Sequence, residues 1–254
     1  MRDTPFFIGF LPPSRWFLAL YALAGVAMVL GFGAVGWAIG LSQADPGDGA
    51  FRFDFGRQTV TGVIEARPYP MLHVTEGTEA IPAGRTIIMS GGGKTGVQSR
   101  ADPLDGQLAT VSGAPLQRGD LTMIQARGGR NGVGAAEEAA ESAVPEVAVT
   151  DLGRWRLAGE ICDGKCLAGA MRPGTGLAHR ACANFCLIGG VPPVFVSSQP
   201  VEGESFLLLG GPDGGPLPEV YLDYTALYVS VEGRLERRGD LLVFLIDPDT
   251  LEIL

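Results

Sequence analysis

The sequence lacks cysteine outside one window: all four cysteines of the 254-residue chain lie between positions 162 and 186. They form no Cys-x-x-Cys pair, which disfavours a thioredoxin-like redox centre, and no Cys-x-x-Cys-His motif, which excludes covalent haem attachment. The chain has only two histidines, and it shows neither a nucleophile–base pair nor a cluster of carboxylates. We therefore expect a protein that is not an enzyme.

Basic residues are also scarce. The 19 Lys and Arg residues are outnumbered by 28 Asp and Glu residues, so the net charge is −9. Binding to the phosphates of a nucleic acid needs clustered basic side chains, so we expect no nucleic-acid partner. The chain instead has 38 glycines and 18 prolines, a composition typical of many turns between short strands. It predicts a mostly β fold.

Residues 16–41 contain no charged residue and no proline. A helix rises about 1.5 Å per residue, so this stretch is long enough to cross a hydrocarbon core of about 30 Å. Aromatic residues stand near its two ends, as they do at membrane interfaces: Trp16, Phe17, Tyr21 and Trp37. The sequence therefore predicts a transmembrane helix at 16–41.

The charges that flank this helix predict its orientation. Arginines precede it and aspartates follow it: Arg2, Arg15, Asp45 and Asp48. The positive-inside rule makes residues 1–15 a cytoplasmic tail and places the bulk of the chain in the periplasm, with the bacterial cytoplasmic membrane around 16–41. A cleaved signal peptide is the alternative, with a small-x-small site at 42–44. The apolar run exceeds the about 7–15 residues of a signal-peptide core, which favours an uncleaved, single-pass signal-anchor.

The rest of the chain divides into two predicted modules. In the first, at 51–126, short β-branched segments alternate with turn residues: 59–66, 71–75, 85–90, 107–112 and 121–125. We place His73 on a strand surface and expect a glycine-rich loop at 91–93. Residues 127–150, rich in glycine and then in alanine and glutamate, predict a linker. The second module occupies 151–254.

The second module repeats the first. Residues 112–121 match 232–241 at an offset of 120, and both copies carry Arg-Gly-Asp in a predicted hairpin turn. Residues 86–92 match 205–211 at an offset of 119, whereas 61–65 match 158–162 at an offset of only 97. The second module therefore carries about twenty extra residues between its first and middle strands, and these include the cysteines.

A short helix is predicted at 177–188, because glycines and prolines close this apolar segment. His179, Cys182 and Cys186 have the spacing i, i+3, i+7 and share one face of it. A strand that ends in a turn carries the other two cysteines, so the helix can dock there and bring five nitrogen and sulfur groups together. The candidate ligands are Cys162, Cys166, His179, Cys182 and Cys186.

Three uses of these residues compete. Two structural disulfides suit an exported domain with an even number of cysteines. Helical residues four apart have Cβ atoms about 5–6 Å apart, too far for a bond, so the disulfides would join Cys162 and Cys166 to the two helical cysteines. A Zn²⁺ or copper site that includes His179 is the second use, although both cysteine pairs are spaced more widely than the usual Cys-x-x-Cys. A thiol–disulfide relay is the third.

The strand pattern of the two modules resembles the small OB-like barrels of exported bacterial proteins. The motif Gly-Glu-Ile-Cys-Asp-x-Lys-Cys at 159–166 is followed by His-x-x-Cys-Ala-x-x-Cys at 179–186 and Gly-Gly-x-Pro-Pro at 189–193. Together they resemble an uncharacterised bacterial family of such modules, over roughly residues 150–250. The resemblance implies two tandem OB-like barrels, the second with a Cys/His-bearing helical insertion at 162–190, and implies no established activity.

We therefore predict a membrane-anchored periplasmic accessory or assembly protein, with a disulfide-stapled insertion and a membrane or periplasmic complex as its partner. The alternative is a metal-binding or thiol-redox protein that uses the Cys/His cluster.

Overall fold

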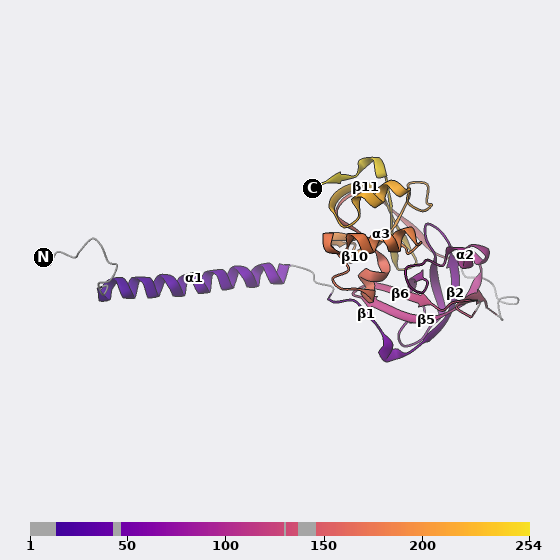
Figure 1. Cartoon of the computed structure of the whole chain (residues 1–254), viewed down its shortest axis with the longest axis horizontal. Coiled ribbons are helices and arrows are strands. Elements are labelled where there is room, and N and C mark those ends of the chain that lie inside the picture. The colour runs from indigo at the N-terminus through magenta and orange to yellow at the C-terminus, as the bar shows by residue number, and fades with distance from the viewer. Residues whose placement is uncertain (1–13, 43–46, 130, 137–145) are drawn as a thin grey trace. The chain divides into compact units, whose positions relative to one another are not determined.

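The computed structural model describes residues 14–42, 47–129, 131–136 and 146–254 (Figure 1). The chain divides into two units, Met1–Asp45 and Pro46–Leu254. Part of the predicted tail (1–13), of the spacer after the helix (43–46) and of the linker (130 and 137–145) lies outside the described residues.

The first unit contains α1, Arg15–Ser42. Its side chains are exposed as far as Gly40, which fits a sequence without one polar face. Among the described residues it is the one helix long and apolar enough to cross a membrane, over Arg15–Gly40. The helix predicted at 16–41 is therefore present.

In the second unit, the first of two closed five-stranded barrels contains β2–β6. The strands are β2 (Gln58–Glu65), β3 (Met71–Glu76), β4 (Thr86–Ser90), β5 (Leu108–Arg118) and β6 (Leu121–Ala126). Their order is β2-β3-β4-β6-β5, with β5 pairing again with β2, and β4 and β6 are parallel. The short strands β1 (Ala50–Phe51) and β7 (Val133–Ala135) also pair with β5. Helix α2 (Gln98–Ala101) and a 3₁₀ turn (Asp102–Leu104) lie between β4 and β5.

The second barrel has the same strand order. It contains β8 (Val149–Asp163), β9 (Pro193–Val201), β10 (Glu204–Gly210), β11 (Tyr228–Arg238) and β12 (Leu241–Ile246). Strands β10 and β12 are the parallel pair, and β11 pairs with both β8 and β12 to close the ring. A 3₁₀ helix (Glu219–Tyr224) precedes β11. The short strand β13 (Glu252–Ile253) pairs with β11.

Strand register confirms the repeat and corrects one of its offsets. The isolated β-bridge Ile64–Asp105 of the first barrel matches the bridge Ile161–Thr225 of the second. The two isoleucines differ in position by 97 and their partners by 120, which are the predicted offsets. In the parallel pairs Ile88 lies opposite Met123 and Leu208 opposite Val243, so the middle strand has an offset of 120. The predicted 119 is wrong by one residue, because both middle strands are uniformly apolar and tolerate a slipped alignment.

The two barrels differ most between their first and second strands. In the first barrel residues 66–70 join β2 to β3, whereas in the second residues 164–192 join β8 to β9. This long connection, called here the β8–β9 connection, contains three of the four cysteines and His179.

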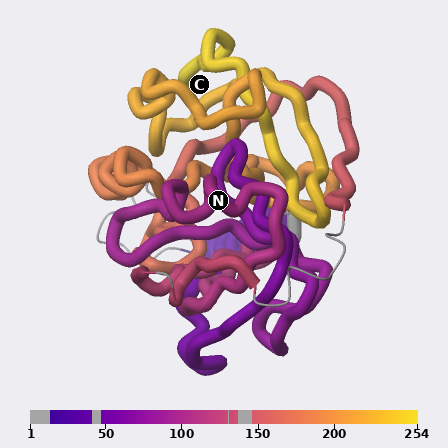
Figure 2. Tube along the Cα trace, turned by 90° about the vertical axis from the view of Figure 1, so that its right-hand side faces the viewer, coloured from indigo at the N-terminus to yellow at the C-terminus, as the bar shows by residue number. Residues whose placement is uncertain are grey.

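Each barrel has its own apolar core, and a third cluster joins them. This third cluster combines Met71, Ile88 and Met123 of the first barrel with Leu208 and Val243 of the second. Figure 2 shows the second barrel, orange to yellow, against the purple-to-magenta chain of the first. The two barrels therefore pack as one compact unit.

The two Arg-Gly-Asp segments form hairpin turns, as predicted, with Gly119 and Gly239 at φ values of 53° and 59°. Each aspartate reaches the other barrel. Asp240 accepts a hydrogen bond from the Thr86 nitrogen at the start of β4, and Asp120 accepts one from the Ser205 nitrogen in β10 at 2.8 Å.

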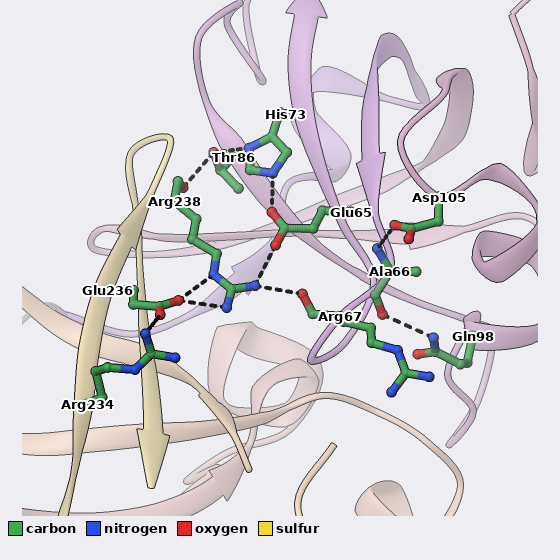
Figure 3. Close-up of polar contacts among 10 residues, drawn as sticks. All are labelled: Glu65, Ala66, Arg67, His73, Thr86, Gln98, Asp105, Arg234, Glu236 and Arg238. Carbon is green, nitrogen blue, oxygen red and sulfur yellow. Dashed lines mark hydrogen bonds and ion pairs between the residues drawn. The ribbon is translucent and has the colours of Figure 1, made fainter. Parts of the chain in front are cut away.

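A buried polar network also crosses this interface (Figure 3). Arg238 of the second barrel donates to Glu236 and to Glu65, and Glu65 also contacts Nε2 of His73 at 2.8 Å. The His73 Nδ1 lies 3.0 Å from the Thr86 hydroxyl. His73 is buried, so its predicted place on a strand surface is wrong: the second barrel covers that surface.

Candidate functional site: a cluster of cysteines, histidine and lysine

The β8–β9 connection begins where β8 ends at Asp163. A π-helical turn (Cys166–Ala170) follows, then a 3₁₀ turn (Leu177–His179) and helix α3 (Arg180–Ile188). The helix predicted at 177–188 is therefore present, with its first three residues in 3₁₀ form. Its inner face buries Ala183, Cys186 and Leu187.

The ends of this connection bring thiols, a histidine and a carboxylate together. The ligand atoms of Cys166, His179 and Cys182 all lie within 4.8 Å of one another, and so do those of Asp163, Cys166 and Cys186. Cys166 belongs to both groups. Four of the five predicted candidates therefore meet in one cluster, here called the cysteine cluster.

Cys162 belongs to neither group. Its thiol donates to the Glu160 carboxylate at 2.9 Å, and burial raises its pKa well above the ordinary value. Successive residues of a strand point to opposite faces, so Cys162 faces away from the side that Asp163 presents. Cys162 therefore lies outside both groups, whereas Asp163, which the sequence analysis did not name as a candidate, belongs to one of them.

His179 is held by Asp163. Its Nε2 lies 2.9 Å from Asp163 Oδ2, and both side chains are buried. The other carboxylate oxygen accepts the backbone N–H of Cys166 at 2.8 Å. A carboxylate partner places the imidazole proton on Nε2, which leaves a lone pair on Nδ1. That Nδ1 is buried and has no hydrogen-bond partner among the described residues.

All four cysteines are free, so the predicted disulfides are absent from the structure. The Sγ atoms of Cys166 and Cys186 are 3.9 Å apart, well beyond the about 2.0 Å of a disulfide. The hydrogen bond from Cys166 lowers the pKa of Cys186 to about 7, and the same contact raises the pKa of Cys166. Cys162 and Cys182 are engaged instead by Glu160 and by a lysine of the first barrel.

That lysine is Lys94, which follows the glycine run of the first barrel. Its Nζ lies 2.7 Å from Cys182 Sγ and 3.7 Å from Cys186 Sγ. The contact with Cys182 raises the pKa of Lys94. In the described part of the chain Lys94 forms no ion pair with a carboxylate, and its side-chain partners are the two cysteine sulfurs.

The loop that carries Lys94 is fastened to the second barrel. The buried Lys165 donates to the carbonyls of Gly91 and Gly93, both at 2.7 Å, and burial lowers its pKa. The Gly96 nitrogen donates to the Gly189 carbonyl at 2.8 Å. A Cβ on Gly189 would lie 1.8 Å from the Lys94 oxygen. The predicted glycine loop is present, and its glycines permit this close backbone contact.

No protein-family model, curated protein or solved structure matches this chain. The geometry of the cysteine cluster therefore carries the functional interpretation.

Proposed function

We propose that the cysteine cluster binds a Zn²⁺ ion through Cys166, His179, Cys182 and Cys186. The observation that carries this proposal is the buried Nδ1 of His179, which has no hydrogen-bond partner among the described residues. A ring nitrogen of the same histidine shares a 4.8 Å group with the sulfurs of Cys166 and Cys182. A buried nitrogen without a partner costs free energy, and a metal ion would satisfy it.

The surroundings of His179 support a ligand role. Metal-binding histidines usually donate their second ring N–H to a carboxylate, which fixes the ring and makes the ligand nitrogen more basic. Asp163 accepts from Nε2 in this way. The fourth ligand is Cys186, whose Sγ shares the second 4.8 Å group with Asp163 and Cys166.

Charge favours zinc over copper. Three thiolates and a neutral imidazole leave a Zn²⁺ site with a single negative charge, and the Lys94 ammonium at Cys182 can balance it. With Cu⁺ the same ligands would carry one more negative charge than with Zn²⁺, close to the carboxylate of Asp163.

We also propose that α1 anchors the chain in the bacterial cytoplasmic membrane, with the N-terminus inside and the barrels in the periplasm. The 26 residues of Arg15–Gly40 support the anchor, and the flanking charges support the orientation. An accessory or assembly role in a membrane or periplasmic complex fits an anchored metal site better than catalysis does.

The barrels are proposed to be OB-like. In each, the first strand pairs with the second and fourth, and the third strand is parallel to the fifth. This order, with a helical turn before the fourth strand, is the arrangement of OB barrels. In that scheme the β8–β9 connection is a helical insertion between the first two strands, as the resemblance to the uncharacterised exported family implies.

A thiol–disulfide function is the second candidate. It is favoured by Cys166 and Cys186, whose sulfurs are 3.9 Å apart, and by the lowered pKa of Cys186. These two cysteines come from the two different Cys-x-x-x-Cys pairs, as the predicted disulfides would require.

Metal analysis of the full chain, purified in detergent without chelator, separates the candidates. We expect one equivalent of zinc in the wild type and in Cys162→Ser, and almost none in Cys182→Ser or His179→Gln. Cys162→Ser is the matched control, because it removes a buried thiol outside the cluster. Zinc that persists in Cys182→Ser, or a wild type without metal and with a Cys166–Cys186 bond, would refute the zinc proposal.

A further inference from the structure

Lys94 and Cys182 form a contact that metal binding alone does not explain. Lys94 comes from the first barrel and Cys182 from the second, 88 positions later, yet nitrogen and sulfur are 2.7 Å apart. The backbone on both sides of this contact is held by Lys165 and by the bond between Gly96 and Gly189.

Cys182 is also the accessible thiol of the cluster. It is partly exposed, whereas the other three cysteines are buried, and Lys94 lies at the surface. The thiolate is the form of a cysteine that reacts with peroxides. Cys182 is therefore the thiol of the cluster that an oxidant meets first.

We propose that Cys182 is a peroxide-reactive cysteine and that Lys94 captures its sulfenic acid, so that a covalent Lys94–Cys182 sulfenamide joins the two barrels. This chemistry does not rest on the proposed zinc site, and it takes place in the metal-free protein.

The oxidant is hydrogen peroxide or an alkyl hydroperoxide. The Cys182 thiolate attacks one peroxide oxygen, so that an S–O bond forms and the O–O bond breaks. With hydrogen peroxide, the leaving hydroxide takes a proton from the Lys94 ammonium and departs as water, which leaves a sulfenic acid beside a neutral amine. The amine then attacks the sulfenic sulfur: an S–N bond forms, the S–O bond breaks, and a second water leaves with a proton from nitrogen. One peroxide is consumed, two waters form, and the chain loses two hydrogen atoms.

Competing thiols are less well placed than the amine. Cys186 lies four residues along the same helix, where Cβ atoms are about 5–6 Å apart and a disulfide is strained. Cys166 Sγ shares the 4.8 Å group with Cys182, but its hydrogen bond goes to Cys186. The Lys94 nitrogen, 2.7 Å from Cys182 Sγ, is the nearest nucleophile among the described residues.

Peptide mapping of the full chain tests the proposal. The protein in detergent is freed of metal with a chelator and treated with one equivalent of hydrogen peroxide. We expect a tryptic species in which the peptides of Lys94 and Cys182 are joined, cleavage after Lys94 is blocked, and the mass is about 2 Da below the sum of the two peptides. Dithiothreitol should break the Lys94–Cys182 crosslink and restore the two separate peptides.

Lys94→Arg is the matched control, because a guanidinium keeps the positive charge and does not give up its proton. In this variant we expect no crosslink, labelling of Cys182 by a sulfenic-acid reagent, and further oxidation to the sulfinic acid. A wild-type product in which Cys182 is bonded to Cys166 or Cys186, or an equal yield of labelled sulfenic acid in both proteins, would overturn the proposal. Zinc content plays no part in these readouts, so the two proposals can fail separately.

Discussion

The carboxylate of Asp240, in a turn of the second barrel, accepts the backbone N–H of Thr86, which begins a strand of the first. The same carboxylate pairs with Arg85 at 2.7 Å. The turn thus binds the other barrel through a charged group that is only about one-third exposed.

Loss of this contact should weaken the pairing of the barrels. We expect Asp240→Ala to lower the free energy of unfolding by about 1–2 kcal/mol, because a hydrogen bond to a charged group is lost and the Thr86 nitrogen is left without a partner. Thermal and urea denaturation measure this change. Asp223→Ala, at an exposed position, should be neutral. An equal effect of both substitutions would mean that the contact of Asp240 with Thr86 makes no specific contribution to the free energy of unfolding.

Two carboxyl groups at the barrel interface, those of Glu204 and Asp120, predict a pH dependence of stability. The hydrogen bond with Asp120 raises the pKa of Glu204 from 4.5 to about 7. The folded protein therefore holds a proton that the unfolded chain releases between these values, so this contribution to stability is full below about pH 4.5 and is lost as the pH rises through 7.

Glu204→Gln should remove that dependence. Because Glu204 is partly exposed, we expect a gain on the order of 1 kcal/mol above pH 7 and little change at pH 4. Denaturation of wild type and variant across pH 4–8 checks the sign. A wild type that becomes more stable relative to the variant as the pH rises would contradict it.

Asp163 offers a test of how the metal ligand is oriented. Asp163→Asn keeps an oxygen that can accept from Cys166, but its amide cannot accept the His179 proton as a carboxylate does. We expect zinc affinity to fall about 10- to 100-fold, as for other partners of ligating histidines. Glu160→Gln, which alters the carboxylate bonded to Cys162, is the control, and chelator competition gives both affinities. Equal zinc affinities in Asp163→Asn and Glu160→Gln would contradict the proposal that His179 is a zinc ligand oriented by Asp163.

Gly189 tests the contact between the glycine loop and α3. Its φ of −74° suits any residue, so Gly189→Ala acts only through the clash of the new Cβ with the Lys94 oxygen. We expect a loss of about 1–3 kcal/mol in stability and a lower yield of the Lys94–Cys182 crosslink. Gly128→Ala, where no atom lies within 4 Å, should leave both unchanged.

Local features of this chain were predictable, and contacts between distant segments were not. The strands of the first barrel and the helix at 177–188 followed from apolar patterns bounded by glycine and proline. The contact of Lys94 with Cys182 could not be predicted, because no sequence periodicity links a loop to a helix 88 residues later. Asp163 is not distinguished by a Cys/His pattern, because a carboxylate is neither sulfur nor imidazole. Strand alternation nevertheless places Asp163 and Cys162 on opposite faces. The burial of His73 was not predicted, because the residues that cover this strand surface belong to the second barrel.

The reciprocal contacts of Asp120 and Asp240 bear on the ancestry of the chain. Each barrel carries both an aspartate turn and the strand end that such a turn binds. A surface with both halves of a contact is self-complementary, which is the condition for an isologous dimer. A single barrel of this kind could therefore have paired with its own copy before a peptide joined the two. In the joined chain the two copies differ: the second carries the cysteine cluster, and the first carries the loop whose Lys94 contacts it.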